Sequence, residues 1–184
     1  MTQPRTYTFD RSPDDKKSAE GQVEVLETAL LVAPNDPVKR FMLGKAYRNA
    51  ARLDPAIENL TKAVSLRPEY GVAHYHLGLA HLEKGSVEPA AAAFARATEH
   101  KPELFDAWYW RGHTQHLIGQ HEPATVAFEQ VLEREPEHAD ALREGGDAYA
   151  AIERHERAAE LYAKAVEHFP RDAELCFRLG RSRS

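Results

Sequence analysis

The sequence predicts an all-α protein, a right-handed superhelical solenoid of antiparallel helix pairs. Three sets of residues predict it, because each set recurs every 34 residues along the chain. The prolines are Pro34, Pro68, Pro102, Pro136 and Pro170, and the glycines are Gly44, Gly78, Gly112, Gly146 and Gly180. The third set is apolar and comprises Ala56, Ala90, Ala124 and Ala158, followed by Leu60, Phe94, Phe128 and Tyr162. A fixed period of this length indicates a repeating unit that buries its apolar faces only against its neighbours.

Each period is predicted to contain two helices. The first carries the periodic glycine and the second the periodic alanine, and these small residues let two helix backbones approach closely. Pro55, Pro89 and Pro123 are expected at the first position of the second helix, where a missing N–H costs nothing. The prolines of the first set follow each second helix, which they cannot continue.

The elements follow in order from this period. Residues 1–17 are expected to be an extended or flexible segment, in which Tyr7 and Phe9 pack either on the first helix or in the groove of a neighbouring molecule. The register then predicts a half-repeat helix, four complete repeats and a partial or truncated last helix: 18–35, 37–70, 71–104, 105–138, 139–172 and 173–184.

At the level of individual residues, the pattern resembles the tetratricopeptide repeat family from about residue 18 to residue 180. The third repeat carries the family's Trp, Gly, Ala, Phe and Pro as Trp108, Gly112, Ala124, Phe128 and Pro136. The first repeat carries Leu43, Gly44, Tyr47, Ala56, Leu60, Ala63 and Pro68 at matching places. The third repeat departs from the pattern at Arg111, where the two earlier repeats have Leu43 and Leu77 and the fourth has Gly145, and at Gln115, where the family prefers Tyr.

The resemblance implies that the first helices line a concave groove that binds a peptide or protein partner. Counting each repeat from 1, positions 2, 5, 9 and 12 form one helical stripe, which 6 and 13 flank. The candidate groove residues are Phe41, Lys45, Arg48, Tyr75, His76, Leu79, Tyr109, Trp110, His113, His116, Arg143 and Asp147. This groove is expected to be basic at one end, aromatic in the middle and acidic at the other. The alternative is that these side chains pack against neighbouring helices or the chain's own termini.

The histidines of the stripe raise the question of a metal. His113 and His116 lie three residues apart on one helix, so both could face one ion, with His76 or Asp106 completing the site. The simpler interpretation is polar lining, or binding that depends on pH, because imidazoles titrate near pH 6.5. We therefore predict neither a metal nor a cofactor.

Other classes of function are disfavoured. A net charge of -5 argues against a nucleic-acid partner, and the apolar runs are too short for membrane insertion. Cys176 is the single cysteine, which rules out an internal disulfide framework and fits a cytoplasmic location. No phosphate-binding loop or nucleophile motif is present, so we predict no enzyme. The family's two-carboxylate clamp is also missing, because Phe41, Lys45, Asp106 and Trp110 stand where it needs Lys, Asn, Lys and Arg.

Two functions remain. The first is a non-enzymatic scaffold or adaptor that binds a peptide or protein in the groove. The second is a structural protein that forms homo-oligomers through the exposed ends of the array.

Overall fold

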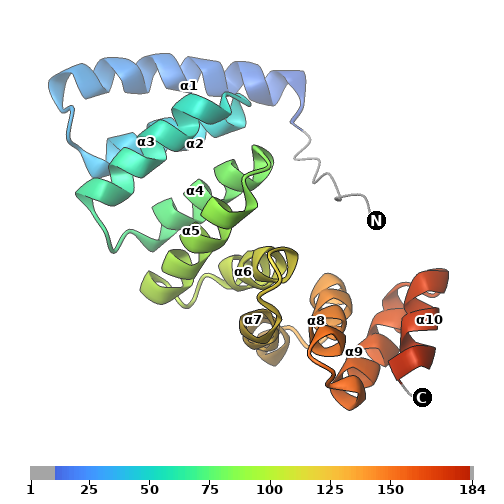
Figure 1. Cartoon of the computed structure of the whole chain (residues 1–184). Helices are drawn as coiled ribbons and strands as arrows, with labels where there is room; N and C mark the ends of the chain where they lie inside the picture. The colour runs from blue at the N-terminus through green and yellow to red at the C-terminus, as the bar shows by residue number, and fades with distance from the viewer. Residues whose placement is uncertain (1–10, 183–184) are drawn as a thin grey trace. The chain divides into compact units, whose positions relative to one another are not determined.

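A computed structural model describes residues 11–182, and every regular element in that range is an α-helix (Figure 1). The helices are α1 Pro13–Val32, α2 Pro37–Asn49, α3 Leu53–Leu66, α4 Gly71–Glu83, α5 Val87–His100, α6 Phe105–Leu117, α7 His121–Arg134, α8 Ala139–Ala151, α9 His155–His168 and α10 Ala173–Ser182. Tyr7 and Phe9 lie outside the described residues, so the expectation for them stays a prediction.

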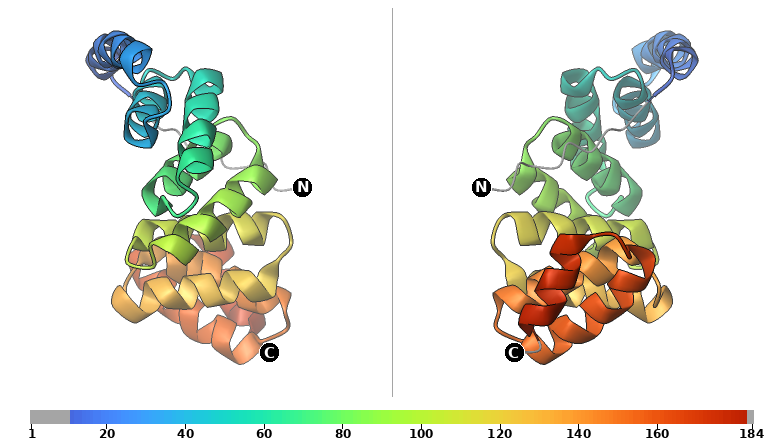
Figure 2. Two further views of the ribbon diagram at one scale, coloured as in Figure 1. Left: turned by 90° about the vertical axis from the view of Figure 1, so that its left-hand side faces the viewer. Right: turned by 90° about the vertical axis from the view of Figure 1, so that its right-hand side faces the viewer.

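The helices divide into two compact units, residues 1–101 and 102–184. In the first unit α2 packs on α1 and α3, and α4 packs on α3 and α5. In the second unit α6 packs on α7, and α8 packs on α7 and α9. The last helix, α10, which is red in Figure 2, packs on α9. Even-numbered helices are the first helices of the repeats. The surface that α2 and α4 form in one unit, and α6, α8 and α10 in the other, is called the first-helix face.

Close approach of the paired helices in the four complete repeats depends on the periodic glycines Gly44, Gly78, Gly112 and Gly146. A Cβ atom on Gly78 of α4 would lie 2.7 Å from the ring of Phe94 on α5. A Cβ on Gly146 of α8 would lie 2.6 Å from the ring of Tyr162 on α9. Both rings are almost fully buried, so the glycine and the large residue of each repeat fill the same space between two helices.

The turns inside the helix pairs repeat as regularly as the helices. Ala51, Gly85, Glu153 and Gly119 all have positive φ, of 60°, 82°, 60° and 78° respectively. These four residues occupy the same place in four successive repeats. Glycine adopts this conformation without steric cost, whereas Ala51 and Glu153 are held in it by the packing of the helices that they join.

Two local expectations are wrong. Residues 13–17 are helical rather than extended, because Ser12 and Asp15 form a capping box at the start of α1 and Pro13 occupies its first turn. Pro55, Pro89 and Pro123 are the third residues of α3, α5 and α7, not the first. Prolines are accommodated there equally well, because the first four N–H groups of a helix have no partner inside the helix.

Candidate functional site

The first-helix face of the first unit centres on a group of aromatic rings. The ring of Phe41 on α2 lies 5.2 Å from that of Tyr70 and 5.4 Å from that of His76 on α4. Tyr75 packs edge-on against His76 at 5.3 Å and reaches the buried Phe94 at 6.0 Å. These rings therefore contact each other and the neighbouring helix, as the alternative interpretation of the sequence expected.

The charges of this face are largely paired. Glu83, at the end of α4, accepts a hydrogen bond of 2.6 Å from Arg11 and lies 3.3 Å from Arg48 of α2. The Glu83 side chain is only 5% exposed and the Arg48 side chain 12% exposed. Lys45 is exposed, and among the candidates of this unit it is the cation that faces solvent.

Burial also affects His76. Its pKa is lowered to about 3, first by burial and then by the positive charges of Arg48 and Lys45. His76 is therefore neutral in the folded protein at pH 6.5.

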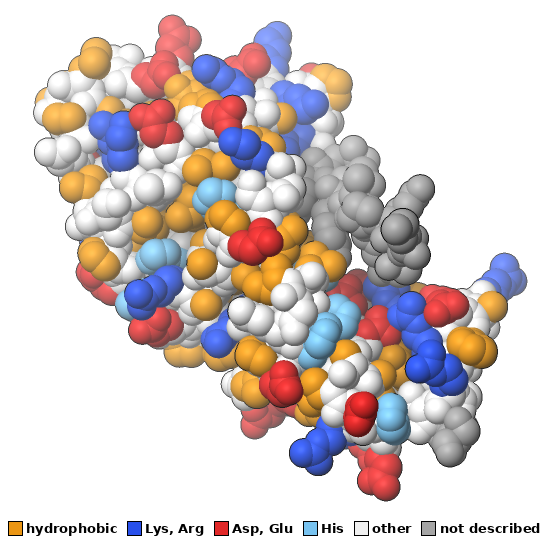
Figure 3. Space-filling model, in the orientation of Figure 1, with side chains coloured by type: hydrophobic (Ala, Val, Ile, Leu, Met, Phe, Trp, Pro, Cys, Tyr) orange, Lys and Arg blue, Asp and Glu red, His pale blue; other side chains and the backbone are white. Residues whose placement is uncertain are grey.

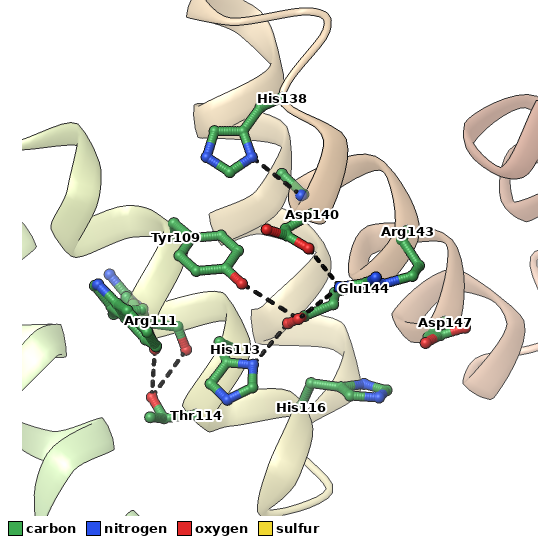
Figure 4. A network of polar contacts seen from close by, with 12 residues as sticks. Tyr109, Arg111, His113, Thr114, His116, His138, Asp140, Arg143, Glu144 and Asp147 are labelled. Carbon is green, nitrogen blue, oxygen red and sulfur yellow. Dashed lines mark hydrogen bonds and ion pairs between the residues drawn. The ribbon is translucent and has the colours of Figure 1, made fainter. Parts of the chain in front are cut away.

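The first-helix face of the second unit is built around Glu144 of α8 (Figure 4). Its Oε1 accepts a hydrogen bond of 3.2 Å from the Tyr109 hydroxyl, and its Oε2 accepts one of 2.6 Å from Nδ1 of His113. Arg143 lies 3.8 Å away and also pairs with Asp140. Burial alone would raise the pKa of the Glu144 carboxyl, but the hydrogen bond and charge of His113, followed by Arg143 and Tyr109, lower it. A charged carboxylate thus joins α6 to α8.

This network fixes the orientation of Trp110. Its ring meets Tyr109 edge-on at 5.2 Å and His113 edge-on at 5.7 Å. Tyr109 in turn is stacked on His138 at 5.2 Å. Trp110 remains half-buried, so part of its ring reaches the surface in a fixed position.

The predicted acidic character of the fourth repeat is reduced by residues that the sequence analysis did not consider. Arg178 of α10 donates to both oxygens of Asp147, at 2.6 and 2.7 Å, and the Tyr162 hydroxyl donates to the same carboxylate at 2.7 Å. Arg178 occupies position 6 of the partial last repeat, so extending the register to α10 could have found it. Arg11 lies outside any repeat and carries no such signal.

Several candidate residues are less accessible than predicted. Leu79, His113 and Arg143 are at most 9% exposed, so they support the surface rather than line it. The large apolar side chains that do reach solvent on the first helices belong to flanking or stripe positions: Val38, Met42, Leu117 and Phe177, at 40%, 48%, 51% and 61% exposure. Figure 3 shows that acidic and basic side chains are interspersed on the visible surface rather than gathered by sign.

The histidines do not assemble with other ligands. Within residues 11–182, no group of three His, Cys, Asp or Glu side chains is arranged to hold a metal ion. His116 instead lies beside His121 of α7, with their Nδ1 atoms 3.1 Å apart. Burial lowers the pKa of His116, and the charge of His121 lowers it further, while Asp147 opposes this shift. Among the described helices, none has the length and apolar character that crossing a membrane requires.

Comparison with known proteins identifies the architecture. The model of the tetratricopeptide repeat family matches residues 41–103 and 118–173, which is more than half of the chain. The chain belongs to the tetratricopeptide repeat family. The predicted fold class, an all-α array of paired helices, is thereby confirmed. A search of curated proteins returned no match.

Solved structures of the same family are similar over most of their length. A structure described as the MamA protein is 28% identical, with a TM-score of 0.73, and the match covers 86% of this chain and 87% of that one. A structure of YrrB, described as a tetratricopeptide repeat protein with an unusual peptide-binding site, is 25% identical, with a TM-score of 0.77 and coverage of 90% and 84%. A MamA fragment from Desulfovibrio magneticus RS-1 is 23% identical, with a TM-score of 0.71 and coverage of 85% and 89%, and shows the fold alone. Tetratricopeptide repeats are typically protein-interaction modules.

Proposed function

We propose that this protein is a non-enzymatic scaffold that binds an extended or helical peptide of a partner protein on its first-helix faces. The observation that carries the proposal is the network of Tyr109, His113 and Glu144, which holds the partly exposed Trp110 in place before any ligand arrives. A preformed aromatic anchor binds well because little side-chain entropy is lost on association. YrrB, a protein of the same family, is described as having a peptide-binding site, and this description supports a peptide as the ligand proposed here.

The proposed site comprises the candidate residues that the sequence singled out, in two roles. Each unit contributes its own peptide contacts, which are Phe41, Lys45 and Tyr75 in the first unit and Tyr109, Trp110 and His116 in the second. Arg48, His76, Leu79, His113, Arg143 and Asp147 hold that surface in position through the contacts described above. A cytoplasmic location belongs to the same proposal, because a chain with one cysteine has no internal disulfide to maintain.

The test uses peptides selected from a random displayed library on the wild-type protein. We expect Trp110→Ala to weaken binding of the best peptide about tenfold or more, which is the effect typical of a central aromatic anchor. Val126→Ala is the matched control, since Val126 is 61% exposed on α7, a second helix, and its variant should bind normally. Equal affinity of both variants, with unchanged circular dichroism, would contradict the proposed site.

A second candidate, self-assembly, is favoured by one observation. Large apolar side chains are exposed on the first and last described helices, namely Val25, Leu31 and Val32 on α1 and Phe177 on α10. Contacts between unlike surfaces of identical chains produce open assemblies. Size-exclusion chromatography with light scattering separates the two functions. If the molar mass stays that of the monomer while the protein concentration is raised about a hundredfold through the micromolar range, assembly of this kind is excluded.

A further inference from the structure

The fourth residue of the first helix makes the same hydrogen bond in three successive repeats. Nε of Arg40 donates to the Pro34 carbonyl at 2.9 Å. Nε2 of His74 bonds to the Pro68 carbonyl at 2.8 Å, so this nitrogen carries the proton, because a carbonyl oxygen only accepts. Nε1 of Trp108 donates to the Pro102 carbonyl at 2.9 Å. A planar side chain with an N–H group thus joins each of these repeats to the proline that ends the preceding one.

The fourth repeat breaks this pattern and contains a pocket at the same place. Leu142 occupies the fourth position and has no N–H to donate to the Pro136 carbonyl. A pocket of about 630 Å³ opens there, with Pro136 and Leu142 in its lining, between residues of α7 and α9. Leu132, Leu142 and Leu161 are each at most 8% exposed and form its apolar part. The pocket therefore lies where the other repeats place a side chain that hydrogen-bonds to the preceding proline.

The repeats themselves indicate which side chain suits the pocket. Arg40 relies on a second acceptor, because its NH1 donates to Oδ1 of Asn59 at 2.9 Å. Three repeats further on, Leu161 stands in place of Asn59, so an apolar side chain replaces the second acceptor that Arg40 uses. An indole needs one acceptor, as Trp108 does, and its remaining surface is apolar and matches the three leucines.

The charged residues around the pocket indicate what lies next to the indole. Three carboxylates, Glu129, Glu133 and Glu160, face two cations, Arg157 and Lys164. Arg157 binds Glu129 at 2.9 Å and Glu160 at 2.6 Å, which raises its pKa. The interaction described for Glu133 is a long hydrogen bond of 3.5 Å from the Gln130 amide. The surplus carboxylate favours a positive charge on the ligand.

We propose that this pocket binds the tryptophan side chain of a partner polypeptide in which Lys or Arg adjoins that tryptophan. The indole rests on Leu132, Leu142 and Leu161 and donates to the Pro136 carbonyl, while the adjacent cation pairs with Glu133. This site lies on α7, α8 and α9, and it uses none of the residues of the proposed peptide-binding face.

The experiment uses the full chain with leucine methyl groups labelled for NMR and four blocked peptides of otherwise identical sequence. The peptides contain Trp-Arg, Trp-Glu, Ala-Arg or Ala-Glu at their centre. With Trp-Arg we expect shifts at the methyl groups of Leu132, Leu142 and Leu161, and no shift at Leu43 in the first unit. Replacing Trp with Ala should weaken binding more than tenfold, and replacing Arg with Glu should weaken it about two- to fivefold.

Two variants separate this pocket from the peptide-binding face. Leu142→Trp supplies the indole from within the chain and should abolish the methyl shifts of Leu132 and Leu161, whereas Trp110→Ala should leave them intact. Glu133→Gln, an exposed change that does not disturb the core, should remove the preference for Arg over Glu. The proposal is overturned if millimolar Trp-Arg peptide shifts none of the three leucines, or if Glu133→Gln retains the full preference. It is also overturned if a folded Leu142→Trp variant binds as the wild type does.

Discussion

Arg178 on the last helix donates two hydrogen bonds to the Asp147 carboxylate on α8, one to each oxygen. Asp147 also accepts the hydroxyl of Tyr162 on α9, so one carboxylate joins three helices of the second unit. The side chains of Arg178 and Asp147 are 33% and 22% exposed, which shields their interaction from solvent more than that of an ordinary surface pair.

Replacing Arg178 should loosen α10. Arg178→Ala leaves the Asp147 carboxylate with the Tyr162 hydroxyl but without its cation, and we expect a loss of about 1 kcal/mol in the free energy of unfolding. Amide hydrogen exchange should accelerate in residues 173–182 more than elsewhere. The control is Glu174→Ala, which removes the exposed ion pair that Arg178 makes within α10. It should lower the free energy of unfolding by about 0.5 kcal/mol or less. Unchanged exchange in α10 of Arg178→Ala would show that the helix is held by its apolar contacts alone.

Gly78, a periodic glycine of α4, should not tolerate a side chain. In Gly78→Ala the new Cβ would lie 2.7 Å from the Phe94 ring, which is fully buried and cannot move aside. We expect a loss of about 1–3 kcal/mol from overpacking, measured by urea unfolding. Gly21→Ala is the matched control: nothing lies within 4 Å of the added atom, so the better helix former should stabilise α1 by about 0.5–1 kcal/mol. The same sign for both variants would contradict the packing role of Gly78.

Stability of the first unit should depend on the protonation of His76. Its pKa in the folded state is about 3, whereas in the unfolded chain an imidazole takes up its proton near pH 6.5. Below pH 6.5 the unfolded state therefore binds more protons, and stability falls as the pH falls towards 3. His76 should account for a decrease of up to about 1 kcal/mol per pH unit in this window.

The comparison is with His76→Phe, which keeps a ring beside Phe41 and Tyr75 but cannot titrate. Urea unfolding measured from pH 7 to pH 4 should give a steeper loss of stability for the wild type than for the variant. Carboxylates titrate in both proteins and cancel in the difference. Parallel curves would mean that His76 is protonated in the folded state at the lower pH.

The repeat period by itself determined the fold class. The residue types at Pro68, Gly78, Ala90 and Phe94 recur in each repeat because the helices of every repeat pack through the same close contact. Such a local packing rule can be recognised from the sequence alone. The positions of the candidate residues on the first helices followed from the same period, since helical geometry assigns a face to each residue.

Which of those residues reach solvent, and which charges are paired, was decided only by the tertiary structure. Arg11 neutralises Glu83 across a gap of 72 residues, and no repeat register relates these two partners. Leu79, His113 and Arg143 are buried because neighbouring helices cover them, which depends on the side chains of those helices. The pocket beside Leu142 lies where the register places a residue without the side-chain donor of the three other repeats, but its volume is set by the helices around it.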